Sequence, residues 1–472
     1  MSLTDQQIQS IVEDTLKNLR RVHTGAGVQA EAGASWLCDT MDEAVSLAAA
    51  AQRELMQKTL ADRERYIEAM RHAAKENVLK LSELAHQETG YGSVEHKKLK
   101  NLLAIEKTPG VEDLQSDAVS GDFGLTLIER APFGVIGAIT PSTNPTSTVI
   151  NNSISMIAAG NAVVFNPHPA AKRASTEAMR ILNEAIRAAG GPKTLICTVK
   201  EPSQESGKAL MEHKNVPLLA ITGGEAVVRL AMKTGKKVIA AGPGNPPVIV
   251  DDTALIEKAA KDIVDGASFD NNVLCIAEKE VFVYEGVAGA LIMGMQKHGA
   301  YLASTGETEK IVNTVFTKKD GRYILNRQFV GKPATQILRE SGIRFDGSPR
   351  LVIADVDECH PFVTAEMLMP VLGIVRVKHD IHAAIEKAII AEDGCRHTAI
   401  MHSQNVSHLS MAAKALNTTI FVKNAPSYAG LGFNGEGFAS LTIATPTGEG
   451  ITSARTFTRS RRCVLYGDFR IV

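Results

Sequence analysis

The amino-acid sequence predicts an α/β protein with two domains, each built on an open parallel sheet covered by helices. The first observation is that short apolar runs alternate with helical patterns from Gly134 to Ala240. The second is that the same alternation resumes from Pro247 to Val377. Parallel strands need a crossover, usually a helix, so regular alternation of the two patterns predicts sheets of this kind.

Composition and charge restrict the possible classes of function. The chain has 472 residues, of which 44% are hydrophobic and 22% charged, and its net charge is -1. This near-neutral balance argues against nucleic acid as the main partner, and no apolar stretch of about 18 residues suggests a membrane helix. The N-terminal sequence lacks the pattern of a secretory signal. The six cysteines are dispersed and lack zinc-site spacing, which favours reduced thiols in the cytoplasm and no metal.

The N-terminal segment is expected to be an amphipathic helix on a flexible tether. Within residues 1–22, Thr4 and Gln7 form a capping box, and the apolar residues from Ile8 to Leu19 fall on one stripe. Residues 23–35 are small and without pattern, which is typical of a linker. A helix of this length is marginal alone in water, so its apolar face needs a partner. The alternative to a separate partner is packing on the chain's own core or in an oligomer.

The remaining elements follow in order along the chain. Residues 41–100 have a helical pattern, and a polar segment at 121–127 leads into a strand-like run. Strands of the first domain are expected at 134–140, 162–165, 195–197, 218–221 and 238–240, with helices at 151–159 and 170–189. Strands of the second domain are expected at 248–250, 281–283 and 374–377, and residues 440–472 carry further strand-like runs.

Cys275 and Asn144 are the candidate catalytic residues. A thiol and a carboxamide supply a nucleophile and a hydrogen-bond donor for an oxyanion, the minimum for covalent chemistry on a carbonyl carbon. Cys275 follows a polar turn, so its thiol could face a cleft. Asn144 follows a strand, and open α/β sheets bind ligands at the carboxyl ends of strands. The alternatives are a buried structural cysteine and an ordinary turn asparagine.

Two glycine motifs could bind a phosphate, and they differ in context. Thr222, Gly223 and Gly224 follow an apolar run and open a helical pattern, so their N–H groups could meet a phosphate. A tight strand-to-helix turn is the alternative. The Gly-x-Gly-x-x-Gly match at 430–435 has no strand before it and no helix after it, so a loop is expected there.

The segments together resemble the aldehyde dehydrogenase superfamily over residues 36–472. Within it, the chain is most similar to the CoA-acylating branch and to the propionaldehyde dehydrogenases of bacterial microcompartments. The segments that carry the resemblance are 131–137, 141–145, 221–224, 268–277, 365–371 and 444–450. The resemblance implies an aldehyde dehydrogenase-like fold with a small β oligomerisation arm. The implied parts are a dinucleotide-binding domain at 36–245 (with 120–132 in the arm), a catalytic domain at 246–440, and a C-terminal segment and arm at 441–472.

The resemblance also implies a role for each matching residue. Cys275 would attack an aldehyde to give a thiohemiacetal, while Asn144 and the Cys275 N–H would bind the oxyanion. NAD would accept a hydride, which leaves a thioester on Cys275, and Glu366 would hold the nicotinamide-side ribose. The other implied NAD-binding positions are Ile139, Thr140 and Pro141 beside the nicotinamide, and Thr222, Gly223 and Gly224 near the pyrophosphate.

One departure from the hydrolytic branch determines the expected product. Ala241 or Gly242 stands where hydrolytic members carry the glutamate that activates water, and neither side chain takes a proton. Water would then attack the thioester slowly, whereas a thiol is already partly ionised at pH 7, which fits coenzyme A. Asn166 and His168 lie where the hydrolytic enzymes have a lysine.

Two histidines have an expected role and an alternative. His168 could meet the adenosine portion of a coenzyme, or it could be a surface-loop histidine. His397 matches a Gly-x-x-His-Thr loop of the acylating branch and could orient the thiol or the nicotinamide carboxamide. The alternative for His397 is a structural histidine.

The implied function is NAD-dependent oxidation of a short aldehyde, propionaldehyde before acetaldehyde, to its acyl-CoA. The acyl pocket is expected near Asn271, Asn272, Ile276 and Leu431. A homodimer or homotetramer is expected. The N-terminal helix resembles the encapsulation peptides that bind microcompartment shell proteins, so the expected location is the cytoplasm, inside a microcompartment.

Two alternative functions stay open at the level of the sequence. One is a hydrolytic aldehyde dehydrogenase that produces a carboxylic acid, and the missing glutamate speaks against it. The other is a non-catalytic, shell-binding homologue. The presence of Cys275, Asn144 and Glu366 together speaks against this second alternative.

Overall fold

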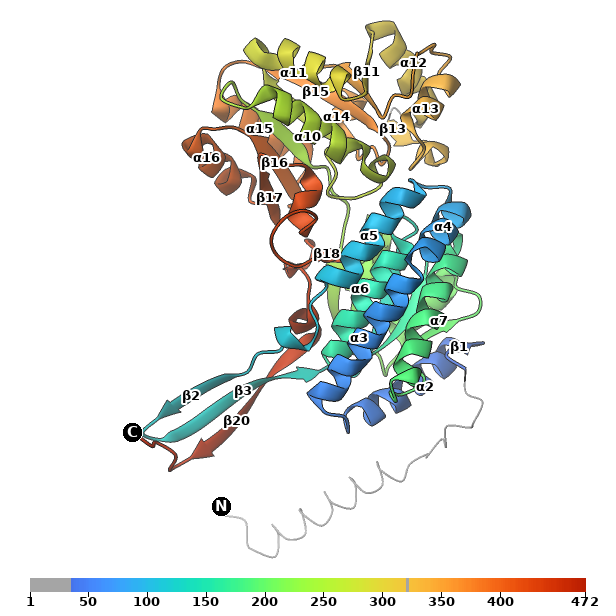
Figure 1. Ribbon diagram of the computed structural model, residues 1–472, viewed down its shortest axis with the longest axis vertical. Coiled ribbons are helices and arrows are strands. Elements are labelled where there is room, and N and C mark those ends of the chain that lie inside the picture. The colour runs from blue at the N-terminus through green and yellow to red at the C-terminus, as the bar shows by residue number, and fades with distance from the viewer. Residues whose placement is uncertain (1–34, 320–321) are drawn as a thin grey trace, which may run out of the picture. The chain divides into compact units, whose positions relative to one another are not determined.

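Two large parallel sheets and a three-stranded antiparallel sheet organise the chain (Figure 1). The computed structural model describes residues 35–319 and 322–472. The expected helix at 4–22 and the linker, apart from Ser35, lie outside these residues. The predicted α/β class with parallel sheets is confirmed.

The first sheet has six parallel strands, and β4 is its central switch point. Its order is β1 (Leu37–Cys38), β6 (Ile196–Val199), β5 (Ala162–Pro167), β4 (Val135–Thr140), β7 (Leu218–Thr222) and β8 (Lys237–Ala241). Every residue of β5 and β6 is buried, because helices cover the sheet and the strands need no polar face. The chain proceeds outward from β4 in both directions, and open sheets bind ligands at the carboxyl side of such a point.

Helices cover this sheet in layers. The helix α2 (Met41–Leu55) packs on β5 and β6, and α6 (Pro145–Ala158) packs on β4 and β5. The other helices of this region are α3 (Leu60–Glu76), α4 (Val78–Thr89), α5 (Val94–Lys107), α7 (Lys172–Ala188), α8 (Gln204–Glu212) and α9 (Glu225–Met232). The helix predicted at 151–159 begins earlier, at Pro145, where proline suits the first turn. All of α6 is buried, so no polar face marks where it starts.

The second sheet has seven parallel strands. Its order is β11 (Ala300–Ala303), β14 (Leu351–Asp355), β15 (Val371–Val377), β10 (Glu280–Tyr284), β9 (Pro247–Val250), β16 (Thr398–His402) and β17 (Ile420–Lys423). Its helices are α10 (Ile256–Ser268), α11 (Glu285–Lys297), α12 (Thr305–Val315), α13 (Ala334–Glu340), α14 (Pro361–Thr364), α15 (Ile381–Glu392) and α16 (Val406–Leu416). A short antiparallel pair, β12 (Phe316–Lys319) and β13 (Arg322–Leu325), follows α12.

The third sheet is a narrow arm, clearly separate from the helical layers in Figure 1. Its central strand β3 (Gly124–Pro132) pairs with β2 (Asp117–Gly121) on one side and with β20 (Thr458–Tyr466) on the other. A second small pair, β18 (Ile443–Ala444) and β19 (Gly450–Ile451), precedes β20. The arm thus joins strand-like segments that are far apart in the sequence, as the resemblance implied. None of the helices within the described ranges is long and apolar enough to span a bilayer.

Candidate active site

The loop that carries Cys275 has an unusual backbone. Asp270, Asn271 and Asn272 all have positive φ, at 48°, 53° and 63°. Asp and Asn tolerate this left-handed region better than other non-glycine residues. The Asp-Asn-Asn sequence therefore permits a tight turn directly after α10, and backbone strain of this kind is common at functional sites.

Side-chain hydrogen bonds hold this loop in place. The Asn271 amide donates to the Gly331 carbonyl at 2.8 Å. The Asn272 amide donates to the carbonyls of Ala267 and Glu278 at 2.7 and 2.9 Å. The buried Lys279 ammonium donates to the Asn272 carbonyl at 3.0 Å and also contacts the Asn272 side-chain oxygen. The two asparagines that were expected beside the acyl pocket thus use their amides to fix the loop.

Gly244 lies where three of the predicted site residues meet. A Cβ at this position would lie 2.8 Å from the Cys275 carbonyl oxygen and 2.9 Å from His397 Cγ. Its N–H donates to Glu366 Oε1 at 3.3 Å. The structure therefore brings Cys275, His397 and Glu366 together around one residue without a side chain. All three precede strands of the second sheet, so they lie at the amino ends of β10, β16 and β15.

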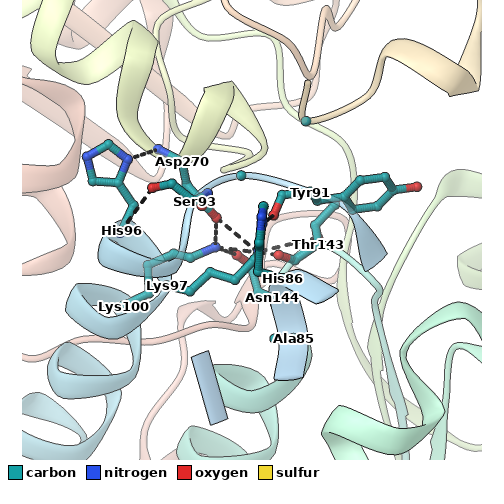
Figure 2. Close-up of polar contacts among 12 residues, drawn as sticks. Ala85, His86, Tyr91, Ser93, His96, Lys97, Lys100, Thr143, Asn144 and Asp270 are labelled. Atoms are coloured by element: carbon teal, nitrogen blue, oxygen red, sulfur yellow. Dashed lines mark hydrogen bonds and ion pairs between the residues drawn. The ribbon is translucent and has the colours of Figure 1, made fainter. Parts of the chain in front are cut away.

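Asn144 is held from behind by a buried lysine. Lys100 Nζ donates to Asn144 Oδ1 at 2.6 Å and to the Thr143 carbonyl at 3.4 Å. The same ammonium pairs with Asp270, which also pairs with Lys97 at 3.4 Å. Figure 2 shows Lys100 reaching from α5 toward both Asp270 and Asn144. This contact joins the end of β4 to the loop before Cys275.

The electrostatic surroundings of Cys275 favour the protonated form of its thiol. Burial, with a further contribution from the charge of Glu366, raises the pKa of Cys275 to about 12. The positive charges of Lys279 and Lys100 act in the opposite direction. Burial likewise raises the pKa of Glu366, while Lys279 and the Gly244 N–H oppose that rise.

His397 is fully buried and neutral at pH 7. Burial, helped by the charge of Lys279, lowers its pKa to about 4. Its Nδ1 lies 2.9 Å from the Thr398 hydroxyl. Its Nε2 is buried and meets no hydrogen-bond partner in the described part of the chain.

The predicted residues of the first sheet gather at its carboxyl edge. Ile139 pairs in register with Asn166 on β5 and with Ile221 on β7. The Thr140 carbonyl accepts from the His168 N–H at 3.0 Å. The Thr140 hydroxyl is buried without a hydrogen-bond partner among residues 35–319 and 322–472. Pro141 follows directly and is partly buried.

Two side chains at this edge are already engaged. Asn166 accepts from the Ser206 hydroxyl at 2.5 Å and donates to the Ser203 carbonyl at 3.2 Å. His168 is exposed, and its Nδ1 accepts from the Ala170 N–H at 3.1 Å, as a helix cap would. Burial of part of the imidazole and the charge of Arg327 lower the pKa of His168.

Gly223 and Gly224 form the turn between β7 and α9, as predicted. Gly224 is the N-cap residue of α9 and offers no side chain to the first N–H groups of the helix. The hydroxyl of Thr222 lies 2.9 Å from that of Thr442. An uncapped helix start at a strand end is suited to bind a phosphate.

A small cavity lies beside Lys100 and the Cys275 loop. The residues that line it are mostly apolar or aromatic: Lys100, Leu103, Phe269, Leu274, Tyr428, Leu431, Phe433 and Leu441. Leu431 was expected near the acyl pocket and does line this cavity. Ile276, expected there too, is fully buried in the core.

Comparison with known proteins places this chain. The model of the aldehyde dehydrogenase family matches residues 31–437. The chain belongs to this family. It is similar to the propanal dehydrogenase (CoA-propanoylating) of Salmonella typhimurium, with 49% identity over 92% of each chain. It is also similar to the acetylating acetaldehyde dehydrogenase EutE of the same organism, with 46% identity over the full length of both.

Solved structures of the family agree with the fold. A propionaldehyde dehydrogenase from a fucose-utilisation microcompartment of Clostridium phytofermentans has a TM-score of 0.90 at 48% identity, covering 92% of this chain and 99% of that one. The Rhodopseudomonas palustris propionaldehyde dehydrogenase with bound propionyl-CoA also has a TM-score of 0.90, at 49% identity, covering 93% of this chain and 97% of that one.

Several residues around this candidate site escaped the sequence analysis. Lys97 and Lys100 stand in a basic stretch that resembles a solvated helix face, yet both are buried. The signal that could have revealed them is their i, i+3 spacing on one face of α5. Lys279 stands between two glutamates at the start of a strand, and burial lowers its pKa. Gly244 could have been noticed only from the packing around it.

Proposed function

We propose that this chain oxidises a short aldehyde with NAD and transfers the acyl group to coenzyme A. Propionaldehyde is the favoured substrate and acetaldehyde the second. The observation that carries the proposal is the absence of a proton acceptor in the segment 241–244, which borders Cys275. Gly242 has little room for one, since a Cβ there would lie 2.8 Å from Pro446 Cγ. The names of the similar CoA-propanoylating and acetylating enzymes support the same reaction.

The reaction begins at Cys275. Its thiolate attacks the aldehyde carbon, and the oxyanion is stabilised by the Asn144 amide and the Cys275 N–H. NAD supplies the hydride acceptor when bound. The product on the enzyme is a thioester of Cys275. A Rhodopseudomonas palustris relative has been solved with bound CoA and an acylated cysteine, which supports this route.

The residues present fit a dinucleotide. The buried Thr140 hydroxyl at the end of β4 has no hydrogen-bond partner among the described residues, so it could bind a polar group of the cofactor. The α9 N-terminus after Gly223 and Gly224 suits a pyrophosphate. Glu366 has one carboxylate oxygen on the Gly244 N–H, which leaves the other to accept from ribose hydroxyl groups. Ile139, Pro141, Asn166 and His168 complete the same edge of the first sheet.

Deacylation then depends on the attacking thiol. Neither Ala241 nor Gly242 can take a proton from water, so hydrolysis is slow. The thiol of coenzyme A is partly ionised near pH 7 and needs less help. His397 is neutral, and its buried Nε2 meets no hydrogen-bond partner among the described residues. This nitrogen is therefore free to orient the entering thiol or the nicotinamide carboxamide.

The decisive experiment follows NADH in a stopped-flow instrument with propionaldehyde, with and without coenzyme A. We expect a burst of about one NADH per Cys275 without coenzyme A and sustained turnover with it. Cys275→Ala should abolish the burst while NAD binding, measured by calorimetry, persists. Cys359→Ala, which changes an exposed cysteine, is the matched control. Sustained turnover to propionate without coenzyme A would establish the hydrolytic alternative instead, and no NADH at all would establish the non-catalytic one.

We also propose that the arm mediates homodimer or homotetramer formation and that residues 1–22 bind a microcompartment shell protein. A relative from a microcompartment supports the second assignment. Deletion of residues 1–20 should leave activity unchanged and abolish co-sedimentation with purified shells. Loss of folding on this deletion would show instead that the segment packs on its own chain.

A further inference from the structure

We infer that Lys100 is a positioning residue that holds the Asn144 carboxamide in register with the Cys275 loop. The inference rests on the proposed function. It adds a residue that orients the oxyanion donor, a role that the Cys275 thiol, the Asn144 amide and the cofactor do not fill. Its basis is a single ammonium group that contacts both Asn144 and Asp270.

The first step is the orientation of the amide. A lysine ammonium has three donors and no acceptor, so the Asn144 atom that faces Lys100 at 2.6 Å must be the oxygen. The nitrogen therefore faces away from Lys100. One of its two N–H groups meets the Thr143 hydroxyl at 3.3 Å, which leaves the second for a substrate oxygen. Without Lys100, the amide could rotate and present its oxygen to the oxyanion instead.

The second step is the link to the nucleophile. Asp270 lies five positions before Cys275 and is the first of the three left-handed residues of that loop. Its carboxylate accepts from the Ser93 N–H at 2.9 Å and pairs with Lys97 and Lys100. Gly92 makes room for it, because a Cβ there would lie 1.8 Å from Asp270 Oδ1. Lys100 thus connects the oxyanion donor on the first sheet to the loop that carries the thiol.

The third step is the cost of this arrangement. Lys97, Lys100 and Asp270 are exposed by only 2%, 4% and 0%. Buried charges are expensive, and apolar replacements of such pairs are often neutral or stabilising. Burial lowers the pKa of Lys100 to about 8, so it remains mostly protonated at pH 7. Although burial opposes it, the two lysines hold the pKa of Asp270 below its usual value.

Lys100 and Asn144 act together on one bond-forming step. Before this step the Cys275 thiol loses its proton to water. The resulting thiolate donates an electron pair to the aldehyde carbon, the S–C bond forms, and the carbonyl π pair moves to oxygen. A correctly oriented Asn144 N–H stabilises that oxygen, and the Lys100 charge behind the amide strengthens the N–H as a donor. No proton or electron leaves the site in this step.

The test is a double-mutant cycle on the full chain, read as the burst rate and kcat with propionaldehyde, NAD and coenzyme A. Asn144→Ala should lower kcat by about 10²-fold or more, as loss of an oxyanion donor does. Lys100→Met should lower kcat by at least about 10-fold with an unchanged KM for NAD. In the Asn144→Ala background, Lys100→Met should then change kcat by less than about twofold, because the amide it orients is gone. Losses that multiply would overturn the inference.

Two lysines of the same helix provide controls. Lys97→Met removes the other positive charge that pairs with Asp270. It should lower the melting temperature as much as Lys100→Met does, but it should reduce kcat less. Lys98→Met, at a partly buried position of α5, should change neither. Equal losses of kcat in Lys97→Met and Lys100→Met would show a purely structural role. If Lys100→Met does not fold, Lys100→Met combined with Lys97→Met and Asp270→Asn, which removes all three buried charges, carries the same cycle. A wild-type protein without CoA-dependent NADH formation would refute the proposed function itself, whereas multiplicative losses in an active enzyme refute only the role of Lys100.

Discussion

At the scale of single residues, the site depends on two glycines whose lack of a side chain leaves room for neighbouring groups. Gly244 leaves space for the Cys275 carbonyl and the His397 ring, which both lie within 2.9 Å of the place a Cβ would take. Gly92 leaves space for the Asp270 carboxylate. In both places a backbone without a side chain lets a functional loop pass close to another segment.

We predict that Gly244→Ala lowers kcat with propionaldehyde by at least about 10-fold. A methyl group at this position would displace the loop that holds the thiol or the imidazole, and small misplacements in active sites have large kinetic costs. The measurement is steady-state NADH formation together with circular dichroism. Gly286→Ala, a helix position with open space around its Cβ, is the control and should keep full activity. Full activity of Gly244→Ala would show that this contact does not position the site.

At the scale of elements, β16 carries a buried histidine at each end. His397 immediately precedes the strand, and His402 is its last residue. Burial, followed by the charge of Lys258, lowers the pKa of His402 to about 3. Both imidazoles therefore stay neutral in the folded protein while they would take up a proton in the unfolded chain below about pH 6.5.

This difference predicts an acid-dependent stability at β16. Between the unfolded pKa of about 6.5 and the folded value, the unfolded state binds more protons, so the His402 contribution to stability falls as the pH falls. His402→Gln removes that contribution. The free energy of unfolding of this variant, relative to wild type, should therefore improve by up to about 2 kcal/mol from pH 7 to pH 5. Urea unfolding at the two pH values measures it, and a difference independent of pH would contradict the assignment.

At the scale of the whole molecule, the arm carries exposed apolar side chains that the site does not use. Val119 on β2 and Val464 on β20 both pair with Thr126, so they share one face of the sheet. Each is 62% exposed. Solvent-facing valines on a narrow ladder favour contact with another copy of the chain.

We predict that the double variant Val119→Lys and Val464→Lys reduces the proposed oligomer to a smaller species. Two like charges in each copy would have to be buried in the contact, which is costly. Light scattering after gel filtration measures the mass. Val406→Lys, at an equally apolar and 74% exposed position on α16, should leave the mass unchanged. An unchanged mass in the arm variant would place the interface elsewhere.

The sequence predicted the elements that carry strong patterns and missed those that depend on packing. The strands β4, β5 and β7 were found because buried parallel strands are continuous apolar runs. The start of α6 was missed because a helix buried on all sides has no polar face to mark it. Cys275 and Asn144 could be proposed because a thiol and an amide have recognisable chemistry, and Glu366 because its segment matches the family; their roles stay predictions. Lys100 and Asp270 were missed because their meeting joins positions 170 residues apart, and no local pattern records such a contact.

The pairing of β20 with β3 sets an order of events during synthesis. Residues 124–132 pair with residues 458–466. One edge of β3 therefore stays unpaired until the more than 300 residues between the two strands have been synthesised. Both parallel sheets can close before the last strand is made. The proposed association of copies through this arm is therefore postponed until translation is nearly finished, and a chain truncated before β20 would leave the second edge of β3 unpaired and prone to aggregation.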